Sequence, residues 1–367
     1  MIELNGKNNN CIVFTDNIDG QTIAQLINLL NQNFVKNSQI RIMPDCHTGK
    51  GCVIGTTMTI QDKVVPNLVG SDIGCGVLTV KLMDNDIDFK KLDSIIRNYI
   101  PHGASLHQKT IRDFSFLDEL KLNLNSKIQD KIRRSLGTLG GGNHFIEIDR
   151  NCNGDLYLLI HTGSRTLGKE VCDFYQNKAI EINKTNNNNV PDELAYLSEE
   201  DFLNDYLCDA DIASYFAKIN RETIANTIMD KMNLSPEYFF DTIHNYIDTK
   251  TGFLRKGAVS AEKNQKLIIP LNMRDGAIIC KGKGNPDWNF SAPHGAGRLF
   301  SRSQAKEMFS LEEFQQEMKD IFTTSVKKST LDESPMAYKN TTDIINNITD
   351  TVTIIEQIVP VYNFKAN

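Results

Sequence analysis

The order of strand-like and helix-like segments places the strongest constraint on the fold of this chain. Short β-like runs lie at residues 53–60, 77–82, 156–160, 267–271 and 278–280, whereas helical periodicity dominates the middle of the chain. A doubly wound sheet needs strands and helices that alternate along the whole sequence, and this chain lacks that alternation. We therefore expect a mixed α+β fold, in one large domain or two closely packed ones.

Apolar residues at helical spacing predict the helices. Ile23, Leu26, Ile27 and Leu30 mark one helix, and Leu92, Ile95 and Ile96 mark another. We expect a helix at 166–183, two or three helices within 201–232, and a last helix at about 342–357 with Ile344, Ile345, Ile348, Val352 and Ile355 on its apolar face. The Asn-rich stretch 183–189 predicts a surface loop.

Composition excludes some classes of protein. With 367 residues, of which 40% are hydrophobic, the chain can bury a substantial core. Its net charge of -6 means that any nucleic-acid site must be a local basic patch. The 8 cysteines are scattered, unlike a secreted disulfide scaffold, and no apolar run reaches transmembrane length. We expect a cytoplasmic protein with no membrane association.

Four of the 7 histidines stand in glycine-rich or turn-like segments at the ends of apolar runs. They are His144 in GTLGGGNHF, His161 in LLIHTGSR, His244 in TIHNY and His294 in APHGAGR. An isolated histidine is more often structural than a ligand. Four in such settings favour a functional site, because sites are usually built on loops that adjoin strand ends.

The segment VGSDIGCG adds Asp72 and Cys75 to these histidines. A carboxylate and a thiolate three residues apart can face one cleft around a tight glycine turn. Together with several histidines they suit a borderline divalent ion such as Mn, Fe, Co or Zn, whereas Mg prefers oxygen ligands. The alternative is that Cys75 is a small buried hydrophobic residue and Asp72 a turn former.

Three glycine-rich segments are typical of anion binding. One is GGGN before His144, the second places Arg165 at a helix start, and the third is HGAGR, which carries Arg298 and is followed by Arg302. If this last stretch is helical, the two arginines share one face. The alternative for Arg302 is an ion pair with a carboxylate such as Glu307. Each segment alone is a weak signal, but with the histidines they favour chemistry on a phosphorylated substrate.

These motifs resemble those of the RtcB family of RNA-splicing ligases. The resemblance runs from MPDCHTGKG to the terminal VYNFKAN, and VGSDIGCG, GTLGGGNHFIE, HTGSR, HNY, HGAGRLFSR and DESPMAYK occur in the family's order. Six ordered motifs are far more specific than one glycine-rich match. One departure lies at residues 270–276, where the sequence PLNMRDG replaces the family's Gly-Ser-Met turn and Asn272 stands in for the serine contact.

The resemblance implies a single RtcB-like domain over residues 1–367, with β-sheets and surrounding helices around a central metal cleft. It also implies a role for each matching residue. It implies two Mn ions bound by Asp72, Cys75, His144, His161 and His244, with Cys75 as the bridge. It implies that His294 carries GMP as the catalytic nucleophile. It implies nucleotide contacts at Asn143, Glu147, Asn272, Gly295, Ala296, Gly297, Tyr338 and Lys365, and RNA contacts at Arg165, Arg298 and Arg302.

The resemblance also implies an activity. We expect a monomeric ligase that joins RNA 3′-phosphate or 2′,3′-cyclic phosphate ends to 5′-hydroxyl ends with GTP, in RNA repair or tRNA splicing. Its partners are then RNA with broken ends and GTP, and the need for an archease-type activator stays open. Two alternatives remain: a metal-dependent phosphoesterase or nuclease, in which His294 is a general acid or phosphate ligand, and an RNA-end-binding protein without catalysis.

Overall fold

The computed structural model describes residues 1–366, and within that range two large β-sheets share one layer of long helices. The first sheet has the strand order β1-β2-β3-β4-β12-β11, formed by Ile2–Asn5, Asn10–Val13, Ile40–His47, Ile54–Thr59, Phe253–Lys256 and Asn245–Asp248. The second has the order β10-β6-β8-β7-β18-β15-β14, formed by Pro236–Ile243, Gly76–Leu82, Leu156–Thr162, Phe145–Arg150, Val352–Lys365, Gly276–Gly282 and Lys266–Asn272. The mixed α+β fold is therefore confirmed.

One short strand extends the second sheet, and two pairs of short strands form separate two-stranded sheets. Strand β17 (Phe322–Thr323) pairs in parallel with β18, β5 (Lys63–Val64) pairs with β9 (Leu197–Ser198), and β13 (Ala258–Ser260) pairs with β16 (Ser291–Pro293). The remaining helices are α1 (Gly20–Leu30), α2 (Phe89–Tyr99), α3 (Ser126–Ser135), α6 (Arg302–Met308), α7 (Leu311–Glu317) and α8 (Thr341–Asn347). No helix among residues 1–366 is long and apolar enough to cross a membrane.

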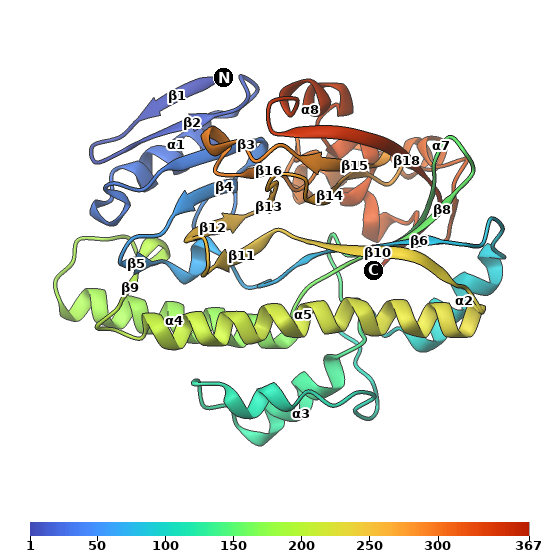
Figure 1. Cartoon of the computed structure of the whole chain (residues 1–367), viewed down its shortest axis with the longest axis horizontal. Helices are drawn as coiled ribbons and strands as arrows, with labels where there is room; N and C mark the ends of the chain where they lie inside the picture. Colours follow the sequence, from blue (N-terminus) through green and yellow to red (C-terminus); the bar gives the residue numbers. More distant parts are fainter. Residues whose placement is uncertain (367) are drawn as a thin grey trace.

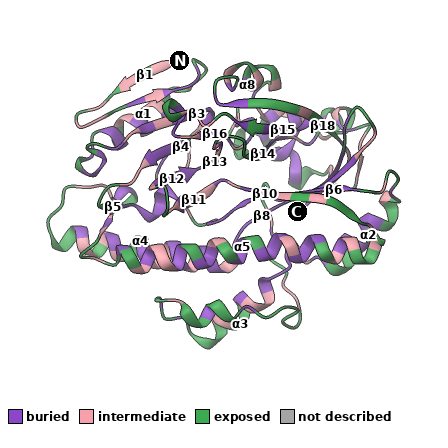
Figure 2. Ribbon diagram, in the orientation of Figure 1, coloured by how far each residue is buried: buried purple, intermediate pink, exposed green. Residues whose placement is uncertain are grey.

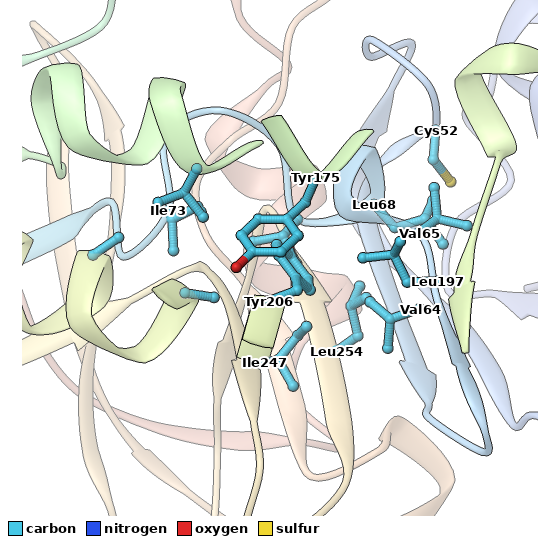
Figure 3. Close-up of a cluster of buried hydrophobic side chains, with 14 of the residues drawn as sticks. Cys52, Val64, Val65, Leu68, Ile73, Tyr175, Leu197, Tyr206, Ile247 and Leu254 are labelled. Carbon is cyan, nitrogen blue, oxygen red and sulfur yellow. The ribbon is translucent and has the colours of Figure 1, made fainter. Parts of the chain in front are cut away.

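Helices α4 (Arg165–Thr185) and α5 (Leu203–Met232) run along one side of both large sheets (Figure 1). Buried residues recur along the whole length of α5, which packs against α4 and also against strands of both sheets (Figure 2). In the core under the first sheet, Tyr175 of α4 and Tyr206 of α5 lie among aliphatic side chains (Figure 3). Helix α5 thus packs against both large sheets.

The expected strands and most of the expected helices are present, including α1, α2 and α4. The prediction of two or three helices within 201–232 was wrong, because α5 is one helix of 30 residues. Its sequence contains no Gly or Pro, and the left-handed residues Phe202 and Asn233 mark its two ends. The surface loop expected at 183–189 begins only after Thr185, because α4 extends to that residue.

The expected last helix at 342–357 was also wrong. Helix α8 ends at Asn347, and Val352–Lys365 forms the long strand β18 between β15 and β7. This segment is rich in β-branched and aromatic residues, and Pro360 sits at an irregularity in the pairing with β7, where its missing N–H is tolerated. Of the predicted apolar positions that fall in β18, Val352 is buried and Ile355 is exposed.

Arg221 of α5 is fully buried and ties the ends of three strands together. Its guanidinium makes a bidentate ion pair with Asp241 of β10, at 2.6 Å for each nitrogen–oxygen contact. The remaining Nη1 donates to the carbonyls of Gly74, just before β6, and Thr162, at the end of β8, each at 2.8 Å. Every polar contact of this buried charge therefore fixes backbone or side chain at one end of the second sheet.

We predict that Asp241→Asn lowers the free energy of unfolding by about 3 kcal/mol, because it leaves the buried Arg221 charge uncompensated. Urea denaturation measures the change. The control is Asp62→Asn, since Asp62 is 65% exposed in its ion pair with Lys63 and its loss should cost less than about 0.5 kcal/mol. Equal effects of the two substitutions would contradict the role given to the Arg221 pair.

Candidate active site

A tight turn before β6 brings Asp72 and Cys75 to the end of the second sheet. Gly74 has a φ of 71°, and its N–H donates to the carbonyl of Asn245 at 2.7 Å. A Cβ at this position would lie 2.6 Å from Cα of Ser214 in α5, so only glycine fits. The turn closes with a hydrogen bond from Cys75 N–H to the carbonyl of Asp72 at 3.1 Å.

Two groups of metal-ligating atoms share the sulfur of Cys75. In one group, Asp72, Cys75 and His144 present ligand atoms within 4.8 Å of one another. In the other, Cys75, His161 and His244 do the same. The sulfur lies 3.5 Å from Nε2 of His144 and 3.3 Å from Nε2 of His161. Because one thiolate can bridge two ions, this arrangement can hold a pair of divalent cations.

The backbone fixes which nitrogen of each imidazole faces the sulfur. Nδ1 of His144 lies 2.9 Å from the carbonyl of Leu139, and Nδ1 of His161 lies 3.2 Å from the carbonyl of Asn143. These contacts assign the ring proton to Nδ1 and leave Nε2 as the ligating atom. His244 lies between Cys75 and Ala258, to which its backbone is hydrogen-bonded on either side.

Burial shapes the protonation of these side chains. It lowers the pKa of His161 and His244 well below the usual histidine value, which favours neutral, ligating rings. Burial, together with the Asp72 carboxylate, raises the pKa of the Cys75 thiol. For Asp72 itself burial acts against ionisation, but the adjacent His144 ring and hydrogen bonds outweigh it and hold its pKa below the usual range. Three imidazoles, one thiol and one carboxylate form a donor set that fits a borderline divalent ion.

His294 lies next to this cluster and is held from the first sheet. Its ring centroid is 4.9 Å from that of His244, and its Nδ1 is 2.6 Å from Oδ2 of the fully buried Asp45 in β3. This distance is within ion-pairing range, although neither atom has a hydrogen-bond partner. Nδ1 is therefore the ring nitrogen next to Asp45. Asp45 was not among the predicted site residues, although it lies within the MPDCHTGKG motif.

A cavity of about 930 Å³ opens on one side of His294. Its lining includes every residue predicted to contact the nucleotide: Asn143, Glu147, Asn272, His294, Gly295, Ala296, Gly297, Tyr338 and Lys365. The lining of a second cavity, of about 250 Å³, includes Asp72, Cys75, His244 and the lysines Lys50 and Lys256. His294 and Asn143 line both cavities, so the histidine stands where they meet.

Two residues of the larger cavity, Glu147 and Asn272, have polar groups that are shaped by their neighbours. Burial raises the pKa of Glu147 to about 7, although the nearby Lys365 and a hydrogen bond from Asn363 oppose this effect. Asn272 accepts from the N–H groups of Arg274 and Asp275, so its carbonyl oxygen is used within its own turn.

The predicted RNA-contacting arginines lie in two different settings. Arg298 and Arg302 line the larger cavity, whereas the guanidinium of Arg165 lies against Gly140, with Nε 3.3 Å from Oγ1 of Thr138, outside both cavity linings. The condition for a shared helical face of Arg298 and Arg302 is not met, because α6 begins only at Arg302.

Arg302 pairs with acids that the sequence did not indicate. Its Nη1 contacts Asp332 at 2.6 Å and Glu333 at 2.5 Å, whereas Glu307, five residues further along α6, is not its partner. Asp332 and Glu333 are 30 residues further along the chain, so no local pattern pointed to them.

Comparison with known proteins identifies the family. The family model described as tRNA-splicing ligase RtcB matches residues 25–123 and 107–366, and the chain therefore belongs to the RtcB family. It is 30% identical to the RNA-splicing ligase RtcB of Escherichia coli K12, over 92% of both chains. It is 28% identical to the tRNA-splicing ligase RtcB of Aeropyrum pernix, over 87% of this chain and 86% of that one.

We predict that Gly163→Ala lowers the affinity for divalent metal about tenfold or more. A Cβ at residue 163 would lie 2.0 Å from Oδ1 of Asp72 and 2.6 Å from its Cγ, so the carboxylate must leave its place beside His144. Competition titration with a metal-sensitive dye measures the affinity. The matched control is Gly141→Ala, where the nearest atom to the new Cβ is 3.7 Å away and affinity should stay unchanged. If Gly163→Ala kept the wild-type affinity for metal, Asp72 would not be a metal ligand.

Proposed function

We propose that this protein is an RNA ligase that joins a 3′-phosphate end, or a 2′,3′-cyclic phosphate end after its hydrolysis, to a 5′-hydroxyl end, with GTP and through a His294–GMP intermediate. The observation that carries the proposal is the place of His294. It lies between a cavity large enough for a nucleotide and a buried donor cluster, and Asp45 engages its Nδ1. Membership of the RtcB family supports the same activity.

The donor groups would hold two Mn ions, one at Asp72, Cys75 and His144, the other at Cys75, His161 and His244. When bound, such ions neutralise charge on the reacting phosphates. Cys75 would serve both ions, which accounts for its position between the two groups of imidazoles.

In the first step Nε2 of His294 attacks the α-phosphorus of GTP. An N–P bond forms, and the bond to pyrophosphate breaks, so pyrophosphate leaves with the electron pair. Positive charge develops on the imidazole during the attack, and the Asp45 carboxylate at 2.6 Å from Nδ1 stabilises it. Asp45 also fixes the ring orientation, so that Nε2 is the atom presented to the nucleotide.

Two further transfers complete the reaction. An oxygen of the RNA 3′-phosphate attacks the phosphorus of the attached GMP, a P–O bond forms, and the N–P bond breaks to restore His294. The 5′-hydroxyl oxygen of the second RNA end then attacks the activated 3′-phosphate. GMP leaves with the bonding electron pair, and the hydroxyl proton passes to solvent, so the sealed phosphodiester and free GMP are the products.

We predict that the wild-type protein, incubated with GTP and Mn, gains the mass of one GMP, and that His294→Ala does not. Intact mass spectrometry measures the adduct, and elemental analysis should find wild-type metal content in the variant, since His294 is not a donor of either group. His107→Ala is the control, because its ring contacts the carbonyl of Gly137 outside both cavity linings.

The same experiment separates the ligase from its alternatives. A phosphoesterase or nuclease would cleave RNA without ever carrying GMP, and an RNA-end-binding protein would do neither. A GMP adduct that persists in His294→Ala would show that another residue is the nucleophile.

We also predict that Arg302→Ala slows sealing while GMP attachment is retained. Arg302 is 46% exposed at the mouth of the larger cavity, where RNA phosphates must arrive. Loss of one phosphate contact should reduce the salt dependence of RNA binding, with the logarithmic slope falling by about 0.7 for a single strand. Fluorescence anisotropy at several salt concentrations measures it. An unchanged slope, or equal loss of GMP attachment, would argue against an RNA contact.

A further inference from the structure

Glu333 is a buried carboxylate at the centre of the cationic side of the active site. It is the last residue of the 3-10 helix η6 (Lys328–Glu333) and is 2% exposed. Its Oε2 accepts from Nζ of Lys365 at 2.5 Å and from the hydroxyl of Tyr338 at 2.8 Å. Its Oε1 lies 2.5 Å from Nη1 of Arg302 and 3.6 Å from Nη1 of Arg298.

The two oxygens of Glu333 contact partners with different expected roles. The groups on Oε2, Lys365 and Tyr338, are those expected to contact the nucleotide. The groups on Oε1, Arg302 and Arg298, are those expected to contact RNA. All four line the larger cavity, whereas Glu333 lies behind them, outside its lining. A ligand in this cavity therefore touches the partners of Glu333 and not the carboxylate itself.

The charge balance keeps this carboxylate ionised and leaves the patch positive. Although burial alone would favour the neutral acid, Lys365 and Arg302 lower the pKa of Glu333 to about 2. The adjacent Asp332 pairs with Arg302 and, at 3.2 Å, with Lys306. Lys365, Arg298, Arg302 and Lys306 thus face the carboxylates of Glu333 and Asp332, and Lys365 also lies near Glu147, so cations outnumber carboxylates here on a chain whose net charge is -6.

We propose that Glu333 is a positioning residue that holds the nucleotide-binding and the RNA-binding side chains in place together, so that one carboxylate serves both GMP attachment and RNA sealing. The inference rests on the proposed ligase function. Lysine and arginine side chains have many rotamers, and a fixed partner restricts them before the substrates arrive. Each oxygen of Glu333 supplies that partner to one of the two sets.

The test substitution is Glu333→Gln, which keeps the shape and removes the charge. We expect single-turnover GMP attachment at saturating GTP, and sealing by the GMP-loaded protein at saturating RNA, each to slow about tenfold or more. RNA binding, measured by anisotropy, should not weaken, because a negative charge has been removed beside two arginines. A merely structural role would instead weaken binding and rates together with thermal stability.

Double-mutant cycles show whether Glu333 acts through its partners. When Lys365→Met is already present, adding Glu333→Gln should slow GMP attachment further by less than about twofold. When Arg302→Ala is already present, adding Glu333→Gln should slow sealing further by less than about twofold. The matched control is Asp332→Asn, since Asp332 contacts Arg302 and Lys306 but neither Lys365 nor Tyr338. It should leave GMP attachment at the wild-type rate.

Three results would overturn the inference: a tenfold additional loss in both backgrounds, an effect of Glu333→Gln on one step alone, or wild-type rates in both steps. If Glu333→Gln does not fold, Glu333→Asp takes its place, because it keeps the charge but sets the carboxylate back by one methylene. It should slow both steps, and wild-type rates would again overturn the inference. A wild-type protein that never gains GMP would refute the proposed function itself, whereas normal wild-type sealing with unaffected variants would refute only the role of Glu333.

Discussion

The buried pair of Arg221 and Asp241 is the interaction on which the rest of the structure depends. A charge in the protein interior must be paired and hydrogen-bonded, and Arg221 meets this requirement only where the ends of β6, β8 and β10 converge. Three of the donor residues adjoin those contacts in sequence: Cys75 after Gly74, His161 before Thr162, and His244 three residues after Asp241. The neighbouring Asn220 bonds the backbone at residues 137, 138 and 163, which orders the loops before His144 and after Thr162. Two consecutive residues of α5 thereby align the segments that carry the donor cluster.

The active site forms where the second sheet meets the first. The second sheet and the turn before β6 supply the thiol, the carboxylate and the imidazoles, while Asp45 of the first sheet orients His294. The donor histidines and His294 have different surroundings. Burial lowers the pKa of the donor residues His161 and His244 and so favours their neutral, ligating rings, whereas His294 faces the Asp45 carboxylate. We propose that the same residue type takes two roles here, metal ligand and nucleophile, according to its surroundings.

Local sequence patterns predicted the strands and most of the helices. Alternating and continuous apolar runs identified β4, β6, β8, β14 and β15. The predicted ligands come together in two groups, whereas the role of His294 stays a prediction. The length of α5 was underestimated because a helix buried on several sides has no clear apolar stripe, and β18 was misassigned because its isoleucines also fit helical spacing. Asp45, Arg221 and Glu333 were missed because each acts on a partner far away in the sequence, so their roles exist only in the folded chain.

The proposed function requires the sulfur of Cys75 to serve two metal sites. Anomalous diffraction at the Mn absorption edge, from a crystal of the protein soaked with Mn, shows where the ions bind. We expect two anomalous peaks, both within bonding distance of Sγ of Cys75, one beside Asp72 and His144 and the other beside His161 and His244. A single peak, or two peaks of which only one contacts the sulfur, would contradict this expectation.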